Sequence, residues 1–178
     1  MNTMIQVLNA LEDEYKNGNT DGEFVYKFYS PLLNKEIAVG IIAKEGGFES
    51  CFCCNSTAAD EFFICIGEDL PILSDNCLRF LLAHEMGHHV HMNMNELKGI
   101  GRFLNNLKGY AMVFSRNFQA ASGNIHQMEI EADAFAVGLI GKESVLDAIT
   151  EIIKIVGSDN TCGKEFINRK RFVEKIGG

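Results

Sequence analysis

The sequence lacks any long apolar segment and any secretory signal. No apolar run approaches the ~18 residues that a membrane-spanning helix needs. The first residues also lack the basic start, apolar middle and small-residue cleavage site of a signal peptide. Residues 1–15 instead predict a helix that carries the acidic run Glu12, Asp13 and Glu14. These absences lead us to expect a soluble, cytoplasmic protein with no membrane span.

The sequence also has no excess of positively charged residues. The chain has 16 Lys and Arg against 24 Asp and Glu, a formal net charge of −8. Nucleic-acid binding needs a basic surface, so we expect no nucleic-acid partner. The six cysteines are better interpreted as reduced thiols than as a disulfide framework. A C-x-x-C spacing at residues 51–54 has no second pair, which favours ordinary packing there over a structural metal site.

The chain length and the change of hydrophobic period predict one α+β domain. A length of 178 residues suits a single domain, residues 1–178. Before residue 70 the apolar residues alternate in short runs, which predicts a small sheet. The predicted strands are 23–29, 36–43, 47–53 and 61–66. We expect 61–66 to be the edge strand packed on the next helix, where a substrate could add a further strand. The second half has helical periodicity.

The most informative motif is His84-Glu85-Met86-Gly87-His88, inside an apolar stretch that predicts a buried helix. Positions i and i+4 of a helix are about 5–6 Å apart, so His84 and His88 can present two imidazole nitrogens to one metal ion. Glu85 lies beside this pair, where its carboxylate can take a proton from a water that the metal activates. Burying these three groups without a partner would cost several kcal/mol, and a bound cation supplies the partner.

A second segment contains the candidate third ligand, because a catalytic zinc site takes three protein ligands and leaves its fourth position to water. Residues 124–140 predict an amphipathic helix. At about 100° per residue, Glu129 shares a face with the small residues Ala132 and Ala136, whereas Glu131 points nearly the opposite way. Small residues let two helices approach closely. We therefore expect Glu129 to be the ligand and Glu131 to be a solvated charge.

Asp133 lies one turn after Glu129 on the same face. Its carboxylate is placed to accept the second ring N–H of His84 or His88, and such bonds fix the tautomer and direction of ligating histidines. The alternative interpretation treats Glu129 and Asp133 as ordinary acids on a helix surface. The histidine motif makes that alternative the weaker one.

Together the two segments resemble the signature of the gluzincin metallopeptidases, HExxH followed by ExxxD. Residues 79–89 and 129–136 are similar to the ImmA/IrrE type, soluble peptidases that cut repressor proteins and usually have asparagine where this chain has Asp133. HtpX-like and CAAX prenyl endopeptidases have the aspartate. Their pattern also has a following helix and a late arginine, which residues 141–156 and Arg171 match. Both branches stay open.

The resemblance implies a zincin-like domain with one catalytic metal centre. By similarity, His84, His88 and Glu129 bind Zn²⁺ and Glu85 is the general base. His91 lies on the same helical face as the two histidines and is an alternative third ligand, although a surface position suits it better. The motif does not fix the metal, because imidazole and carboxylate ligands also suit cobalt, nickel or manganese.

A hydrogen-bond donor for the developing oxyanion is also required. His126, one turn before Glu129, and Arg171 are the preferred candidates, ahead of Tyr110. Tyr110 lies in a segment between the two motifs, residues 93–123, which is locally basic and contains four glycines. That segment is either a lid or docking surface for a substrate protein, or simply a cover for the core.

The sequence thus predicts a zinc-dependent endopeptidase that acts on a protein or peptide, such as a regulatory repressor protein. A second hypothesis is a catalytically silent gluzincin-fold binding protein with a structural metal; the presence of Glu85 argues against it, because a structural site needs no base. A third hypothesis, a metal-free protein with coincidental histidines, is disfavoured by Glu129 and Asp133 on one face.

Overall fold

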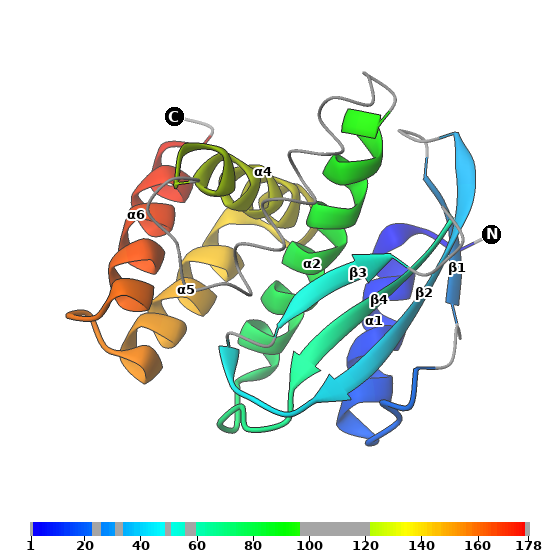
Figure 1. Cartoon of the computed structure of the whole chain (residues 1–178), viewed down its shortest axis with the longest axis horizontal. Coiled ribbons are helices and arrows are strands. Elements are labelled where there is room, and N and C mark those ends of the chain that lie inside the picture. The colour runs from blue at the N-terminus through cyan, green and yellow to red at the C-terminus, as the bar shows by residue number, and fades with distance from the viewer. Residues whose placement is uncertain are drawn as a thin grey trace.

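The α+β class and the helical C-terminal half are both confirmed by the computed structural model, which describes residues 2–22, 26–30, 34–48, 51–55, 60–96 and 122–176. The chain order begins with a helix, continues with a four-stranded sheet and ends with helices (Figure 1). The elements are α1 (Met4–Lys16), β1 (Tyr26–Ser30), β2 (Lys35–Lys44), β3 (Phe52–Asn55), β4 (Glu61–Gly67), α2 (Asp75–Glu96), α4 (Ser122–Ile140), α5 (Lys142–Val156) and α6 (Thr161–Lys175).

The strand order in the sheet is β1-β2-β4-β3. β2 and β4 are parallel, with Val39 opposite Phe62, while β1 and β3 pair antiparallel with their neighbours. The prediction that residues 61–66 form the edge strand is therefore wrong, because β4 is paired on both sides. Its nearly continuous apolar sequence, Glu61–Gly67, is typical of an interior strand. The edge on that side of the sheet is β3.

The predicted strand 47–53 also needs correction, because strand pairing begins only at Phe52. Gly46 has φ 119°, a left-handed conformation that favours glycine. The carbonyl oxygens of Gly46 and Gly47 lie so near Gly67 that a Cβ added at Gly67 would be 2.3 Å and 2.2 Å from them. The chain makes a tight turn here, so β3 starts later than its alternating pattern suggests.

Two helices cover one side of the sheet, α1 against β1 and β2, and α2 against β3 and β4 (Figure 1). α1 starts with a capping box. The backbone N–H of Gln6 donates a hydrogen bond to Thr3 Oγ1, and the backbone N–H of Thr3 donates one to Gln6 Oε1. Its buried side chains are Val7, Leu8 and Leu11. The predicted N-terminal helix is thus present, three residues later than expected.

α2 lies between the sheet and the C-terminal helices, which pack on its other side (Figure 1). Residues 80–90 of α2 are all buried, so the helix has no solvent-exposed face in that part. On the sheet side, His89 stacks on Phe62 with ring centroids 3.9 Å apart, and burial with the Lys35 charge lowers the pKa of His89 to about 3. On the other side, His84 and His88 face α4.

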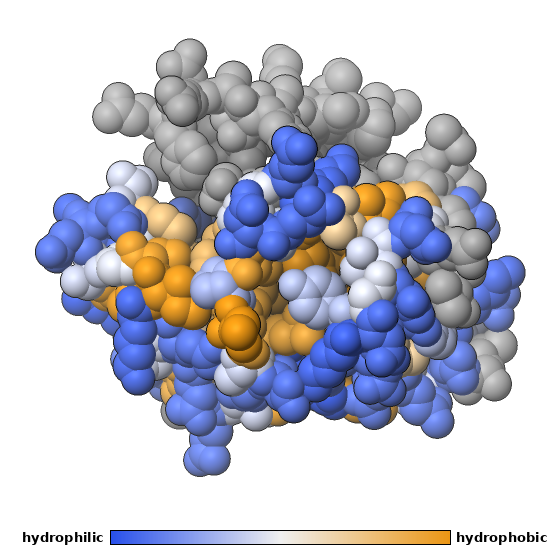
Figure 2. All heavy atoms as spheres, turned by 90° about the horizontal axis from the view of Figure 1, so that it is seen from below, coloured by the Kyte–Doolittle hydropathy of each residue, from blue (hydrophilic) through white to orange (hydrophobic). Residues whose placement is uncertain are grey.

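The lower face of the molecule has hydrophobic residues in its middle, surrounded by hydrophilic ones (Figure 2). The loop before α2 contributes to the exposed apolar surface, because the side chain of Ile72 is fully exposed. Among the residues that the structure describes, no helix is both long enough and apolar enough to cross a membrane. Most of the predicted lid or docking segment 93–123, including Tyr110, lies outside the described residues.

The backbones of α2 and α4 touch at Gly87, inside the histidine motif. A Cβ added at Gly87 would be 3.0 Å from Cα and 3.1 Å from the carbonyl oxygen of Ala132, and 3.1 Å from Cβ of Phe135. Ala132 and Ala136 are fully buried at this contact. Small residues on both helices therefore allow the close approach that the sequence predicted.

Gly87→Ala should separate the two helices and lower the free energy of unfolding by about 1–2 kcal/mol, since an added methyl group overfills a packed interface. Gly138→Ala is the matched control, because Gly138 is an exposed residue of α4 with nothing near its Cβ position. There the change should stabilise the protein by about 0.5–1 kcal/mol through helix propensity. Urea denaturation of both variants measures this difference, and equal effects would contradict the packing argument.

Candidate metal centre

Three helices supply the polar side chains of the candidate site. α2 contributes His84, Glu85 and His88, α4 contributes Glu129 and Asp133, and α6 contributes Arg169. Spacings of four residues on α2 and on α4 place each pair one helical turn apart, on one face of its helix. The close contact of α2 and α4 brings these two faces together.

The donor atoms converge on one point. The Nε2 atoms of His84 and His88 are 3.0 Å apart, and the carboxylate oxygens of Glu129 are 3.1 Å and 3.2 Å from them. Two donors that bind one tetrahedral zinc ion at about 2.0–2.1 Å are about 3.3 Å apart. The three side chains therefore have nearly the separations of ligands that share one small cation.

Glu85 is the second carboxylate at this point. Its carboxylate and the imidazole nitrogens of His84 and His88 lie within 4.8 Å of one another, and all three residues are buried, so this cluster can hold a metal ion. Its Oε2 atom is the buried side-chain atom that has no hydrogen-bond partner among the described residues. Glu85 and Glu129 are thus both candidates for the third ligand. We favour Glu129, because its oxygens lie within hydrogen-bond distance of both imidazoles.

Asp133 fixes the tautomer of His84. Its Oδ1 is 2.9 Å from His84 Nδ1, and because an ionised carboxylate can only accept, this contact favours a proton on that nitrogen. A neutral His84 then has its lone pair on Nε2, the atom that faces His88 and Glu129. This is the arrangement that metal-ligating histidines show in proteins, where a carboxylate or carbonyl orients the ring.

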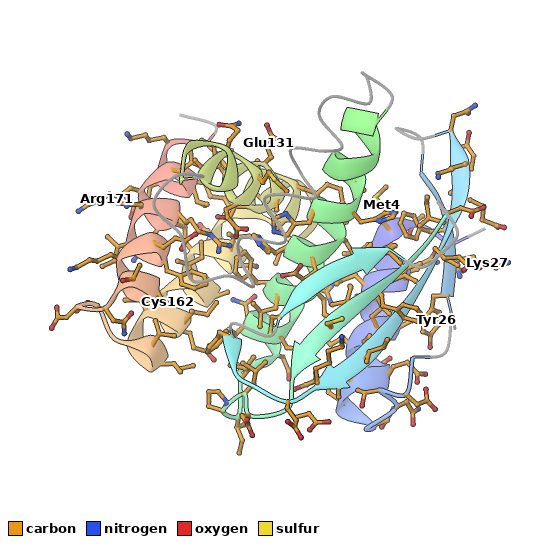
Figure 3. The ribbon with its side chains drawn as sticks, in the orientation of Figure 1. Met4, Tyr26, Lys27, Glu131, Cys162 and Arg171 are labelled. Carbon is orange, nitrogen blue, oxygen red and sulfur yellow. The ribbon has the colours of Figure 1, made fainter. Side chains whose placement is uncertain are left out.

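The arginine that the structure places at this cluster is Arg169, whereas Arg171, the predicted oxyanion donor, lies outside the cluster. Arg171 is exposed, points away from the molecule and donates to Asn168 (Figure 3), and its catalytic role stays a prediction. Arg169 is 5% exposed and binds both Glu129 and Asp133. The sequence pattern that could have identified Arg169 is the apolar face of α6, because Arg169 falls on that face between the buried residues Phe166 and Val173.

The cluster attracts positive charge. Burial and the Arg169 charge lower the pKa of His84, but hydrogen bonds to Asp133 and Glu129 outweigh both and raise it to about 9. Burial raises the pKa of Glu129, but the charges of His88 and Arg169 hold it well below its usual range. Burial also raises the pKa of Asp133, and Arg169 brings it down to about 2. A metal ion must displace the His84 proton, so metal affinity should fall as the pH is lowered below about 9.

The formal charges favour a divalent cation. Glu85, Glu129 and Asp133 supply three negative charges, and Arg169 supplies one positive charge. With neutral imidazoles the cluster is left with two negative charges, which one divalent ion would neutralise. Uncompensated charge in a protein interior is costly, so the donor set, its charge and the unpartnered oxygen of Glu85 all fit a metal ion.

The structure brings together His84, Glu85, His88 and Glu129, with Asp133 against His84. Their roles in binding or catalysis remain predictions. His126 lies within α4, but its side chain, like that of His91, is outside the described part of the structure. Glu131 lies on the outer side of α4 and accepts from Gln127, away from the cluster (Figure 3).

No family model matches the chain, and no curated protein or solved structure is significantly similar to it, so these comparisons do not assign it to a family. The gluzincin resemblance therefore rests on the two motifs alone.

Glu129→Gln should weaken zinc binding at least about tenfold, because the amide removes the carboxylate charge that faces the two imidazoles. Glu131→Gln is the matched control: it makes the same change two residues away, on the outer side of the same helix, and should leave the affinity unchanged. Competition with a chromophoric chelator at pH 7 measures both affinities. Equal losses in the two variants would exclude Glu129 as a ligand.

Proposed function

We propose that this protein is a zinc-dependent endopeptidase in which His84, His88 and Glu129 hold the metal and Glu85 is the general base. One observation carries the proposal. Two imidazole Nε2 atoms and one carboxylate have the separations of ligands on a single cation, and a second buried carboxylate next to them has an oxygen without a partner in the described part of the chain. Three protein ligands and an adjacent base are the requirements of a hydrolytic zinc site.

Zinc bound there supplies Lewis-acid chemistry, because it polarises the scissile carbonyl and lowers the pKa of water toward ~7. Zinc is the metal that we propose because imidazole and carboxylate ligands suit it, although they also suit cobalt, nickel or manganese. The other steps belong to the protein. Glu85 takes the proton of the attacking water on its carboxylate and then delivers it to the nitrogen of the leaving amine.

The surrounding residues keep Glu85 and the ligands in place. Asp133 holds His84 by its Nδ1 proton, so that Nε2 keeps a free lone pair for the metal. The helix around the motif is buried on all sides, which excludes water from the far side of the ligands. His126 remains the predicted oxyanion donor.

A peptide substrate suits the edge of the sheet that contacts α2. β3 contacts α2 and is paired on one side only, with β4; among the described strands none pairs with its other side (Figure 1). An exposed strand edge can bind an extended peptide by main-chain hydrogen bonds. We therefore assign substrate binding to β3, in place of the strand that the sequence predicted. A protein substrate, such as a repressor, is the class that this mode of binding favours.

The alternative is a binding or regulatory protein in which a metal only joins α2 and α4. The same donor atoms would serve a structural site. Glu85 distinguishes the two, because a buried carboxylate with an unpartnered oxygen destabilises a structural site and is useful in a catalytic one.

Glu85→Gln should keep about one zinc per chain and reduce kcat/KM by about 10²–10⁴-fold, since the amide has nearly the same shape but cannot accept the proton. Elemental mass spectrometry measures the metal, and cleavage of a broad peptide library, read by mass spectrometry, measures turnover.

His84→Ala is the companion variant, and it should lose the metal and the activity together. If the metal is only structural, Glu85→Gln will change nothing, whereas His84→Ala will unfold the protein. A wild type that purifies without stoichiometric metal in the absence of chelators would contradict the peptidase proposal.

A further inference from the structure

One guanidinium group spans both carboxylates that α4 contributes to the centre. Nε and Nη2 of Arg169 donate to the two oxygens of Asp133, at 2.8 Å and 2.6 Å, and Nη1 is 3.0 Å from Oε2 of Glu129. Arg169 lies on α6, 36 residues after Asp133. The C-terminal helix therefore reaches the candidate ligand through a single side chain.

Aromatic rings fix the position of this guanidinium. The ring of Phe166, one turn earlier on α6, is centred 4.5 Å from Cζ of Arg169, and the ring of Phe80 is centred 6.0 Å from it. Phe80 lies one turn before His84 on α2, with the two ring centroids 5.7 Å apart. A planar cation against aromatic faces has little freedom to move, so Arg169 is held by α2 and α6 while it binds α4.

The contacts of Arg169 argue against a direct role with substrate. Two of its five N–H groups donate to Asp133, Nη1 forms an ion pair with Glu129, and its side chain is 5% exposed. Nη2 also lies 3.1 Å from Nδ1 of His84, on the side of the imidazole opposite the Nε2 atom that faces Glu129. The guanidinium is thus buried and engaged with the carboxylates that surround the candidate ligands.

We propose that Arg169 is a positioning residue that holds Glu129 and Asp133 in their metal-binding orientation, which makes α6 a part of the metal centre. The inference rests on the metal centre of the proposed function. The guanidinium draws one oxygen of Glu129 toward α6 and leaves the other, Oε1, facing His88 Nε2 at 3.2 Å. Through Asp133 it also fixes the ring of His84, so that two of the three ligands depend on Arg169.

The geometry of the contacts explains why this residue is an arginine. A guanidinium can bind one carboxylate through two parallel N–H groups and a second carboxylate through a third. A lysine ammonium is a single point charge and cannot hold both carboxylates in the same plane. Lysine should therefore replace the charge of Arg169 but only part of its orienting effect.

The inference is tested by measuring zinc affinity in three variants: Arg169→Met, Arg169→Lys and the control Arg171→Met. Arg171 is two residues away on the same helix and exposed. Arg169→Met should raise the zinc Kd by about 10–100-fold, Arg169→Lys by less, and Arg171→Met by no more than about twofold. Chelator competition measures each Kd at a temperature at which circular dichroism shows the metal-free variant folded. In Co²⁺-substituted protein, the visible absorption bands should shift for Arg169→Met and return toward wild type for Arg169→Lys.

A role in folding alone predicts a lower Tm for metal-free Arg169→Met with unchanged Kd and unchanged Co²⁺ bands, and that result would overturn the inference. If Arg169→Met does not fold, the double variant Asp133→Asn with Arg169→Met removes both members of the buried pair and leaves no unpaired charge between them. It should bind zinc more weakly than Asp133→Asn alone, because Glu129 has also lost its partner; equal affinity overturns the inference. Zinc binding that depends on Arg169 without any peptide cleavage would contradict the peptidase proposal and support this one.

Discussion

The contact between α2 and α4 determines most of what this protein can do. The two helices approach until the backbone of Ala132 lies against Gly87, where an added methyl group would crowd Ala132 and Phe135. This contact sets the distance from the imidazoles of α2 to the carboxylates of α4. Because a metal ligand must be placed to within a few tenths of an ångström, the glycine in the middle of the histidine motif is as important to the geometry as the histidines themselves.

The interior of this protein contains an unusual concentration of charge, and the fold compensates for it locally. Two carboxylates of α4 are paired with one arginine of α6 and with the imidazoles of α2. Removing one member of a buried pair costs about 3–5 kcal/mol, because the remaining charge stays buried without its partner. The C-terminal helices therefore do more than cover the core, since the arginine that balances these charges comes from the last of them.

The local part of the site could be predicted from the sequence, and the long-range part could not. Helical periodicity alone places Glu129 and Asp133 on the face of α4 that meets His84, and it places Glu131 on the other side. The order of the strands depends on pairing over long stretches of chain, so the strand nearest to the motif in sequence, β4, is interior and not at the edge. The apolar periodicity of α6 could have indicated that Arg169, and not Arg171, is buried. Its partners Glu129 and Asp133 could not be predicted, because they depend on how α6 packs on α4.

The complete burial of residues 80–90 of α2 affects how the molecule unfolds. This helix packs on the sheet through His89 and on the C-terminal helices through the opposite face, so neither half keeps a complete core without it. Helices in proteins take most of their stability from packing, and the backbone hydrogen bonds of residues 80–90 are shielded by both layers. We therefore expect the sheet and the helical half to unfold together, and the residues of the histidine motif should be among the last to exchange their amide hydrogens with solvent.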